Sequence, residues 1–151
     1  VLGIYVAALI VLLATDLDQK LLPDLITFPL MGYALVVLVL GLNPVLEGKT
    51  QALVADGDLA AVLAAIAAPA LLAVTDRVFH GALGMGDLKL AVSLGLMFGI
   101  TQLFAGFLVG TIGFAVVVLA LVLSRRVSMK TAVPFGPALI AAGVAAAVIQ
   151  L

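Results

Sequence analysis

Six long apolar segments, at roughly 1–15, 24–42, 58–76, 88–100, 102–123 and 133–151, constrain this chain more than any other feature. Crossing the hydrocarbon core of a bilayer as a helix takes about 20 apolar residues. Hydrophobic residues make up 66% of the chain and charged ones only 10%, whereas a soluble domain carries about 25% charged residues. We therefore expect an all-α, polytopic membrane protein with about six transmembrane helices in a single domain, 1–151.

The charged and polar composition excludes several classes of site. The net charge is −1, which gives no electrostatic footprint for nucleic acid. The chain has no cysteine, so disulfides, thiol nucleophiles and cysteine-ligated zinc are excluded. A single histidine, His80, is too few for a histidine-rich metal site. We predict no metal and no cofactor.

The basic residues predict the orientation of the chain in the membrane. If the six segments alternate, one side holds most of them: Lys20, Arg77, Lys89, Arg125, Arg126 and Lys130. The other side holds only Lys49, so the basic side is predicted to be cytoplasmic. The N-terminus then lies outside. Because the chain opens on Val1 and its first apolar segment is short, we expect that segment to end a helix that begins upstream.

The fourth segment places an acid inside the predicted protein. Residues 88–99 would form only about 18 Å of helix, which is too short for a core of about 30 Å. Unless the helix continues through "ITQLF", Asp87 at the start of this segment should therefore lie below the cytoplasmic surface, inside the protein. A set of glycines should let the fourth and fifth helices pack closely. These are Gly95, Gly99, Gly106, Gly110 and Gly113.

Two of the acids stand apart from those that simply begin helices. Asp24 and Asp58 precede apolar segments and suit helix starts. Asp16 instead ends an apolar segment, and Asp87 follows Gly84 and Gly86. Ionisable residues at membrane depth are costly and indicate function. The alternative is that both acids are interfacial, with Asp16 facing Lys20 and Asp87 capping its helix.

Two facing carboxyl groups are the minimum that aspartyl proteolysis requires. One ionised carboxylate takes a proton from water, while the other, still protonated, donates to the scissile carbonyl oxygen. Like charges in a low-dielectric site let the pair hold one shared proton. Glycines beside an acid would let an extended peptide approach closely. Gly84 and Gly86 are therefore predicted to shape such a site.

Three stretches resemble the type IV prepilin peptidases. "DLDQKLLPDLITFPL" is similar to their first motif, an acid seven residues before a proline that is followed by Asp or Asn, here Asp16 and Pro23. "GALGMGDLKL" resembles the second, Gly-x-Gly-Asp-x-Lys, here around Asp87. "VPFGPAL" resembles the start of the family's last helix. The three matches occur in the family's order and span nearly the whole chain.

The resemblance implies an intramembrane aspartyl endopeptidase of the GxGD type. It would remove the short basic leader of prepilins or pseudopilins at the cytoplasmic face of the inner membrane, using Asp16 and Asp87 as its catalytic pair. Asp18 would be secondary, and Lys89 would tune Asp87 or bind the interface. Many family members also carry two Cys-x-x-Cys pairs linked to methylation. This chain has none, so methyltransferase activity and a zinc site do not carry over.

Other classes of protein fit some of the same residues. A proton- or cation-coupled transporter could use buried Asp16 and Asp87 as a relay, although no clear internal symmetry supports it. A membrane scaffold would use the glycines for packing and the acids as caps. A relative of presenilin would carry Tyr before the first acid, where this chain has Thr15. A divalent cation held by Asp16, Asp18 and Asp87 would lack further clear ligands.

Overall fold

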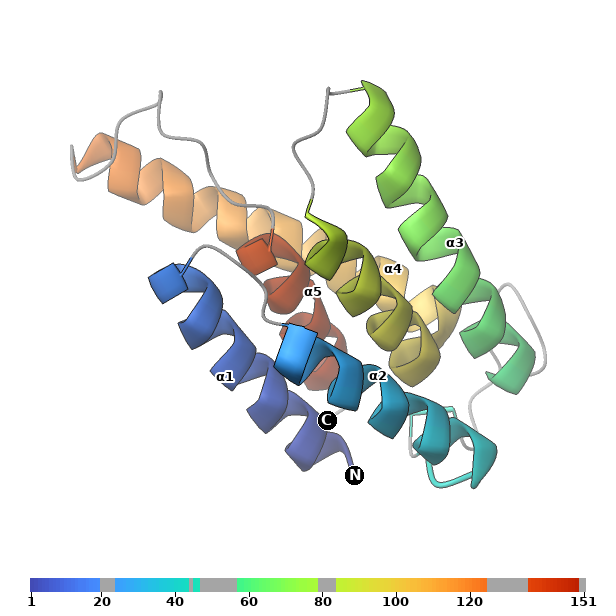
Figure 1. The fold of residues 1–151 in the computed structure, drawn as a ribbon. Helices are drawn as coiled ribbons and strands as arrows, with labels where there is room; N and C mark the ends of the chain where they lie inside the picture. The colour runs from blue at the N-terminus through green and yellow to red at the C-terminus, as the bar shows by residue number, and fades with distance from the viewer. Residues whose placement is uncertain (20–23, 44, 47–56, 79–83, 125–135, 150–151) are drawn as a thin grey trace.

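The computed structural model describes residues 1–19, 24–43, 45–46, 57–78, 84–124 and 136–149, and every regular element in them is a helix (Figure 1). The helices are α1 (Leu2–Gln19), α2 (Asp24–Val39), α3 (Gly57–Val78), α4 (Met85–Leu123) and α5 (Gly136–Ile149). The all-α prediction is confirmed. The described part of the chain has five helices rather than six, because the predicted fourth and fifth segments form one bent helix.

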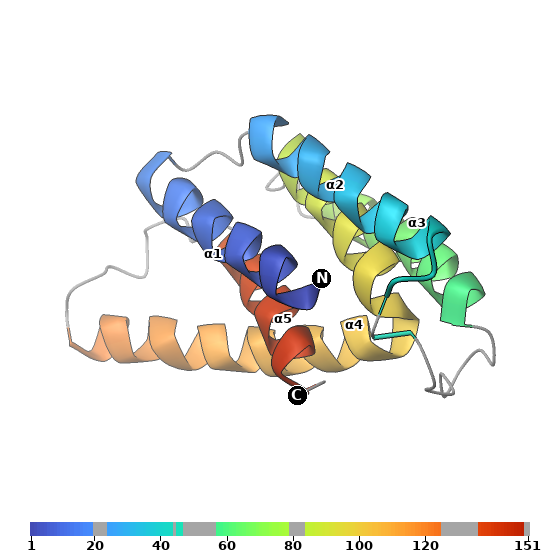
Figure 2. The ribbon, with the colours of Figure 1, turned by 90° about the horizontal axis from the view of Figure 1, so that it is seen from below.

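The bend in α4 occurs at a single residue, Gly99. Its backbone angles, φ 66° and ψ 178°, are not helical and lie in a region that is essentially restricted to glycine. The chain therefore turns sharply with no connecting loop, as Figure 2 shows where α4 changes direction. The arm before the bend, 85–98, is about 21 Å long at 1.5 Å per residue. The predicted short fourth helix is thus present, but it is joined directly to the fifth.

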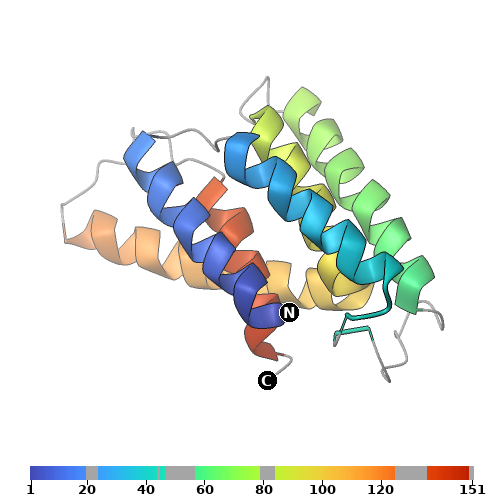
Figure 3. The same ribbon diagram turned by 60° about the horizontal axis from the view of Figure 1, so that its bottom comes forward.

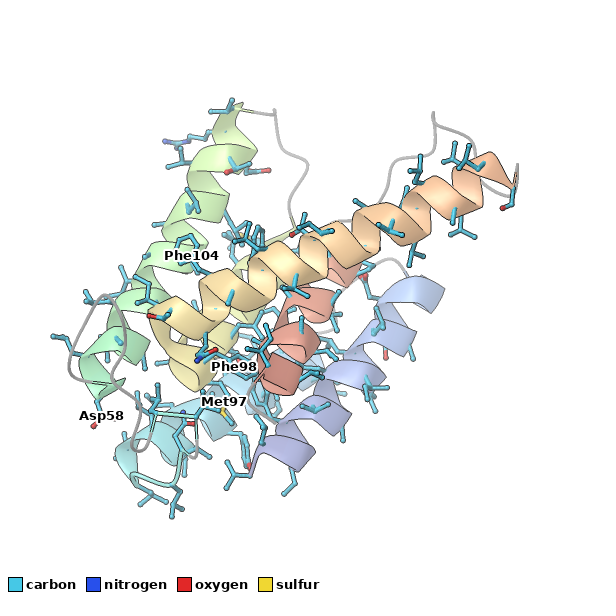
Figure 4. The ribbon with its side chains drawn as sticks, turned by 180° about the vertical axis from the view of Figure 1, so that it is seen from behind. Asp58, Met97, Phe98 and Phe104 are labelled. Carbon is cyan, nitrogen blue, oxygen red and sulfur yellow. The ribbon has the colours of Figure 1, made fainter. Side chains whose placement is uncertain are left out.

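A buried asparagine, Asn43, lies just beyond the C-terminal end of α2 and caps the bend in α4. A break in a helix leaves backbone carbonyls without their usual partners. The side-chain amide of Asn43 donates to the carbonyl of Met97 at 2.9 Å, and its Oδ1 accepts from the backbone N–H of Val45 at 3.1 Å. Figure 4 shows Met97 and Phe98 at the bend and Phe104 on the arm beyond it. Asn43 therefore fixes the bend to the segment that follows α2.

Glycines bring helices close together, but the pairs are α3 with α4 and α4 with α5. The predicted pair was the fourth helix with the fifth. A Cβ added at Gly95 would lie 2.5–2.6 Å from backbone atoms of Ala64 and Ala65 in α3. Gly106 and Gly110 lie against the backbone of α5 in the same way, whereas Gly113 has nothing within 4 Å. The arm before the bend therefore packs closely on α3 at Gly95, and the arm after the bend packs closely on α5 at Gly106 and Gly110.

Two of the described helices are long and apolar enough to cross a membrane, namely Asp58–Val78 and Met85–Leu123. Shorter apolar helices span Leu2–Asp16, Leu25–Val39 and Gly136–Ile149. Large apolar side chains cover much of the outside, among them Leu25 (85% exposed) and Leu123 (75%). So many exposed large apolar side chains suit contact with lipid or another apolar partner.

Candidate active site

Asp16 ends a buried stripe along α1. Tyr5, Leu9, Leu12 and Asp16 follow one another at helical spacings of four, three and four residues, which places them on one face. The first three are fully buried, and Asp16 is only 3% exposed. A carboxyl group in the place of the next apolar side chain is costly to bury. Its burial therefore indicates a use other than packing.

Asp87 lies in the first turn of α4, where a negative charge is favoured by the helix dipole. It is 6% exposed. Its Oδ2 accepts a hydrogen bond of 3.2 Å from the backbone N–H of Gly84, the residue before the helix. This contact is the capping role that the alternative interpretation assigned to Asp87. It uses only one of the two carboxyl oxygens.

One oxygen of each carboxyl group has no hydrogen-bond partner among the described residues. Oδ2 of Asp16 and Oδ1 of Asp87 are buried and make no hydrogen bond in the described structure. Buried polar atoms almost always find a hydrogen-bond partner. Each acid therefore has a carboxyl oxygen that is open to a hydrogen bond from a water molecule or a substrate group, and capping alone does not account for these oxygens.

Tyr5 connects the two helices that carry these acids. Its hydroxyl group and the hydroxyl group of Ser93 on α4 form a buried hydrogen bond of 2.8 Å. The Tyr5 ring also meets the ring of Phe98 edge to face, with 5.8 Å between the centroids. Tyr5 is three turns from Asp16 on the same face of α1. These contacts therefore hold the stripe that ends in Asp16 against the arm of α4 that begins near Asp87.

The two glycines of the second motif do not form a loop of their own. Gly86 lies inside the first turn of α4, and Gly84 precedes it with φ −82° and ψ 153°, angles that any residue adopts. A Cβ added at Gly84 would meet nothing closer than Oδ2 of Asp87, at 3.8 Å. Neither backbone strain nor internal packing therefore requires glycine at position 84. Because Gly84 is exposed, its open side is available to another chain.

Lys89 lies on α4 with its Nζ 4.3 Å from the centre of the Phe28 ring on α2, a cation–π contact. This contact helps to join the start of α4 to α2. Asp18 belongs to α1, but its side chain lies outside the described residues, as do Lys20, Pro23 and His80. Asp58 is exposed in the first turn of α3, far along the chain from both buried acids.

One neighbour of the pair was missed in the sequence. Gly136, the first residue of α5, lies directly against the carboxyl group of Asp16. Gly136 falls in "VPFGPAL", a stretch that by itself indicates only the start of the last helix. Nothing in that stretch indicates which side chain the glycine faces, because the contact joins opposite ends of the chain.

The described residues also contain an apolar cavity of about 340 Å³ between α3, α4 and α5. Its lining includes Ala68, Ala91, Leu94, Phe104 and Leu139. None of the lining side chains is charged, so the cavity offers apolar contact alone. Among the described residues, no group of three or more His, Cys, Asp or Glu side chains could hold a metal ion. Neither Asp16 nor Asp87 lines the cavity.

Comparisons with known proteins agree with the motifs. The family described as the type IV leader peptidase family matches residues 3–149. A relative from Bacillus subtilis (strain 168), named prepilin leader peptidase/N-methyltransferase, is 29% identical over 143 residues. The match covers 95% of this chain and 53% of that protein, so the chain spans about half the length of its relative. No solved structure matches.

Proposed function

Since this chain belongs to the type IV leader peptidase family, we propose that it is an intramembrane aspartic endopeptidase that removes the leader of prepilins or pseudopilins. The observation that carries the proposal is the pair of buried carboxyl groups on α1 and α4. Each keeps one buried oxygen without a hydrogen-bond partner among the described residues. In the proposed mechanism these oxygens hold the water molecule that attacks the substrate.

The proposed reaction needs one proton shared by Asp16 and Asp87. The ionised carboxylate removes a proton from the water as its oxygen attacks the scissile carbonyl carbon. The protonated carboxyl group donates its proton to the carbonyl oxygen, which gives a neutral tetrahedral diol. The carbon–nitrogen bond then breaks: the departing amine takes the proton from the pair, and one hydroxyl group of the diol returns a proton to the pair as the new carboxyl group forms. The shared proton belongs to the pair as a whole, because two coupled groups titrate together.

The membrane setting of the proposal comes from the six apolar segments and the charges between them. We infer that the chain spans the inner membrane several times, with the bent α4 contributing two of the segments. The side richer in lysine and arginine faces the cytoplasm. A substrate with a basic leader and an apolar helix suits this arrangement. Its leader would stay in the cytoplasm while its helix lies in the lipid beside the exposed apolar side chains.

The first glycine of the motif supports a role in substrate approach. Gly84 is exposed, precedes Asp87 by one helical turn, and needs no glycine for its own backbone angles. We propose that its missing side chain lets the peptide backbone of the substrate come close to Asp87. Methyl transfer, which appears in the name of the relative, is not proposed for this chain.

The experiment that tests the proposal uses the purified chain in lipid vesicles with a prepilin as substrate. We expect a single cut at the junction between the basic leader and the apolar helix, identified by mass spectrometry of both products. Proton flux into the same vesicles is measured in parallel with a pH-sensitive dye. Cleavage without flux supports the peptidase. Flux without cleavage would contradict it and favour the transporter that buried Asp16 and Asp87 could also serve.

A further inference from the structure

We propose that Gly136 is a positioning residue that holds the Asp16 carboxyl group in its working position, an inference that rests on the proposed function. A Cβ added at Gly136 would lie 2.7 Å from Oδ2, 3.0 Å from Cγ and 3.1 Å from Oδ1 of Asp16. All three carboxyl atoms therefore lie against the bare α-carbon of the glycine. Real Cβ atoms essentially never come closer than 3.0 Å to such a neighbour. Any larger residue would have to displace the carboxyl group.

The need for glycine here comes from space and not from backbone conformation. The glycines with positive φ in the described residues are Gly41 and Gly99, so the backbone of Gly136 is open to any residue. Gly136 also begins a helix, a position where the preference of helix interiors for alanine over glycine does not apply. What sets this glycine apart is the carboxyl group of Asp16, which occupies the space that a side chain would need.

Helix α5 is well placed to control the position of one acid relative to the other. It packs more extensively on α4 than any other helix does, and it also packs along α1. Figure 2 and Figure 3 show α5 beside α1 and running across the longer arm of α4. The helices α1 and α5 run in opposite directions, so the end of α1 that carries Asp16 lies beside the start of α5 (Figure 1).

A second glycine of α5, Gly143, lies against both helices that carry the acids, so α1 and α4 pack on the same face of α5. A Cβ added at Gly143 would lie 2.6 Å from a methyl carbon of Leu94 and 3.0 Å from one of Leu9. Leu94 follows Asp87 by two turns of α4, and Leu9 precedes Asp16 by two turns of α1. Gly143 follows Gly136 by two turns, so the two glycines share a face of α5. The position of Asp16 is therefore fixed through α5, and Gly136 is where α5 meets its carboxyl group.

The first test compares Gly136→Ala with Gly113→Ala, since a Cβ at Gly113 meets nothing within 4 Å. A displacement of about 1 Å at a catalytic group can reduce a rate about 100-fold. We expect Gly136→Ala to lower kcat for prepilin cleavage by about 10- to 100-fold, with KM unchanged within about twofold and no fall in the melting temperature. Gly113→Ala should leave kcat and KM unchanged. An unchanged kcat in Gly136→Ala would overturn the proposal, as would an equal fall in both variants.

The second test measures the contact itself and does not depend on peptidase activity. The chain has no cysteine, so the double substitution Asp16→Cys with Gly136→Cys adds the only pair of thiols. With 3.0 Å between the Gly136 Cβ and the Asp16 Cγ, the two sulfur atoms are within reach of a disulfide. We expect mild oxidation in membranes to form a disulfide in this double variant. We expect no disulfide in the control that combines Asp16→Cys with Gly113→Cys.

The two tests separate the inference from the function on which it rests. A disulfide between positions 16 and 136, with none between positions 16 and 113, supports the contact of Gly136 with Asp16 even if no substrate is cut. Failure of that pair to join overturns the inference, whatever the cleavage assay shows. If Gly136→Ala does not fold, its kinetics say nothing about positioning, and the disulfide cross-linking result decides. If intact protein cuts prepilin and Gly136→Ala cuts it equally well, the proposed function stands and the positioning role falls.

Discussion

Replacing either Asp16 or Asp87 with asparagine is expected to lower the rate of prepilin cleavage by about 10³-fold or more, because each acid performs a proton transfer that the amide cannot. Asparagine has the shape of aspartate and is neutral, so it removes a buried charge without leaving a cavity. The fold should therefore persist, and the melting temperature of both variants should equal or exceed that of the intact chain. Initial rates at equal protein concentration give the measurement.

Asp58→Asn is the matched control for this prediction. Asp58 is exposed in the first turn of α3, in contrast to the two buried acids. Its replacement should change the cleavage rate by less than about twofold, in line with the small effects of most surface substitutions. Substantial cleavage by Asp16→Asn would remove Asp16 from the mechanism, and the same holds for Asp87→Asn. A loss of activity in all three variants would indicate a general effect on folding.

The second large effect is expected in stability, from Gly95→Ala in the arm of α4 that carries Asp87. Alanine's methyl group would lie 2.5–2.6 Å from the backbone of Ala64 and Ala65. Backbone atoms in a packed helix cannot move aside as a flexible side chain can, so α3 and α4 must separate. Overpacking of this kind destabilises proteins by roughly 1–3 kcal/mol. We expect a value near the upper end, about 3 kcal/mol, measured as a lower melting temperature in detergent.

Gly113→Ala again provides the comparison, since it makes the same chemical change on the same helix at a position with open space. Alanine is favoured over glycine in a helix by up to about 1 kcal/mol. This variant should therefore melt at the same temperature as the intact chain or slightly above it. If Gly95→Ala is as stable as Gly113→Ala, the close approach of α3 to α4 at this position is wrong.

The helices of this protein could be predicted from the sequence because the apolar segments are long and the breaks between them are polar. Asp16 and Asp87 could also be singled out, since each is an acid at the edge of an apolar segment and each falls in a motif of the family. Asp87 was expected to lie inside the protein, and its 6% exposure confirms that burial, whereas its depth in the membrane stays a prediction. These inferences depend on local features of the chain, which a sequence displays directly.

The contacts that position the acids could not be predicted, because they join residues that are distant in the chain. Tyr5 and Ser93 are 88 residues apart, and Asn43 and Met97 are 54 apart. The glycines were correctly predicted to bring helices together, but their spacing does not indicate which helix lies opposite. The bend at Gly99 was expected as a break between two helices, since a left-handed glycine and a short loop leave similar signals in a sequence.

The central claim is that Asp16 and Asp87 act as one pair holding one proton, and the pH dependence of kcat/KM for prepilin cleavage tests it most directly. Below the range of the pair both acids are protonated and neither can accept a proton from water. Above it both are ionised and neither can donate to the carbonyl oxygen. The proposed mechanism therefore predicts a bell-shaped profile with two apparent pKa values that belong to the pair. A rate that rises with pH to a lasting plateau, while the protein stays folded, would contradict it.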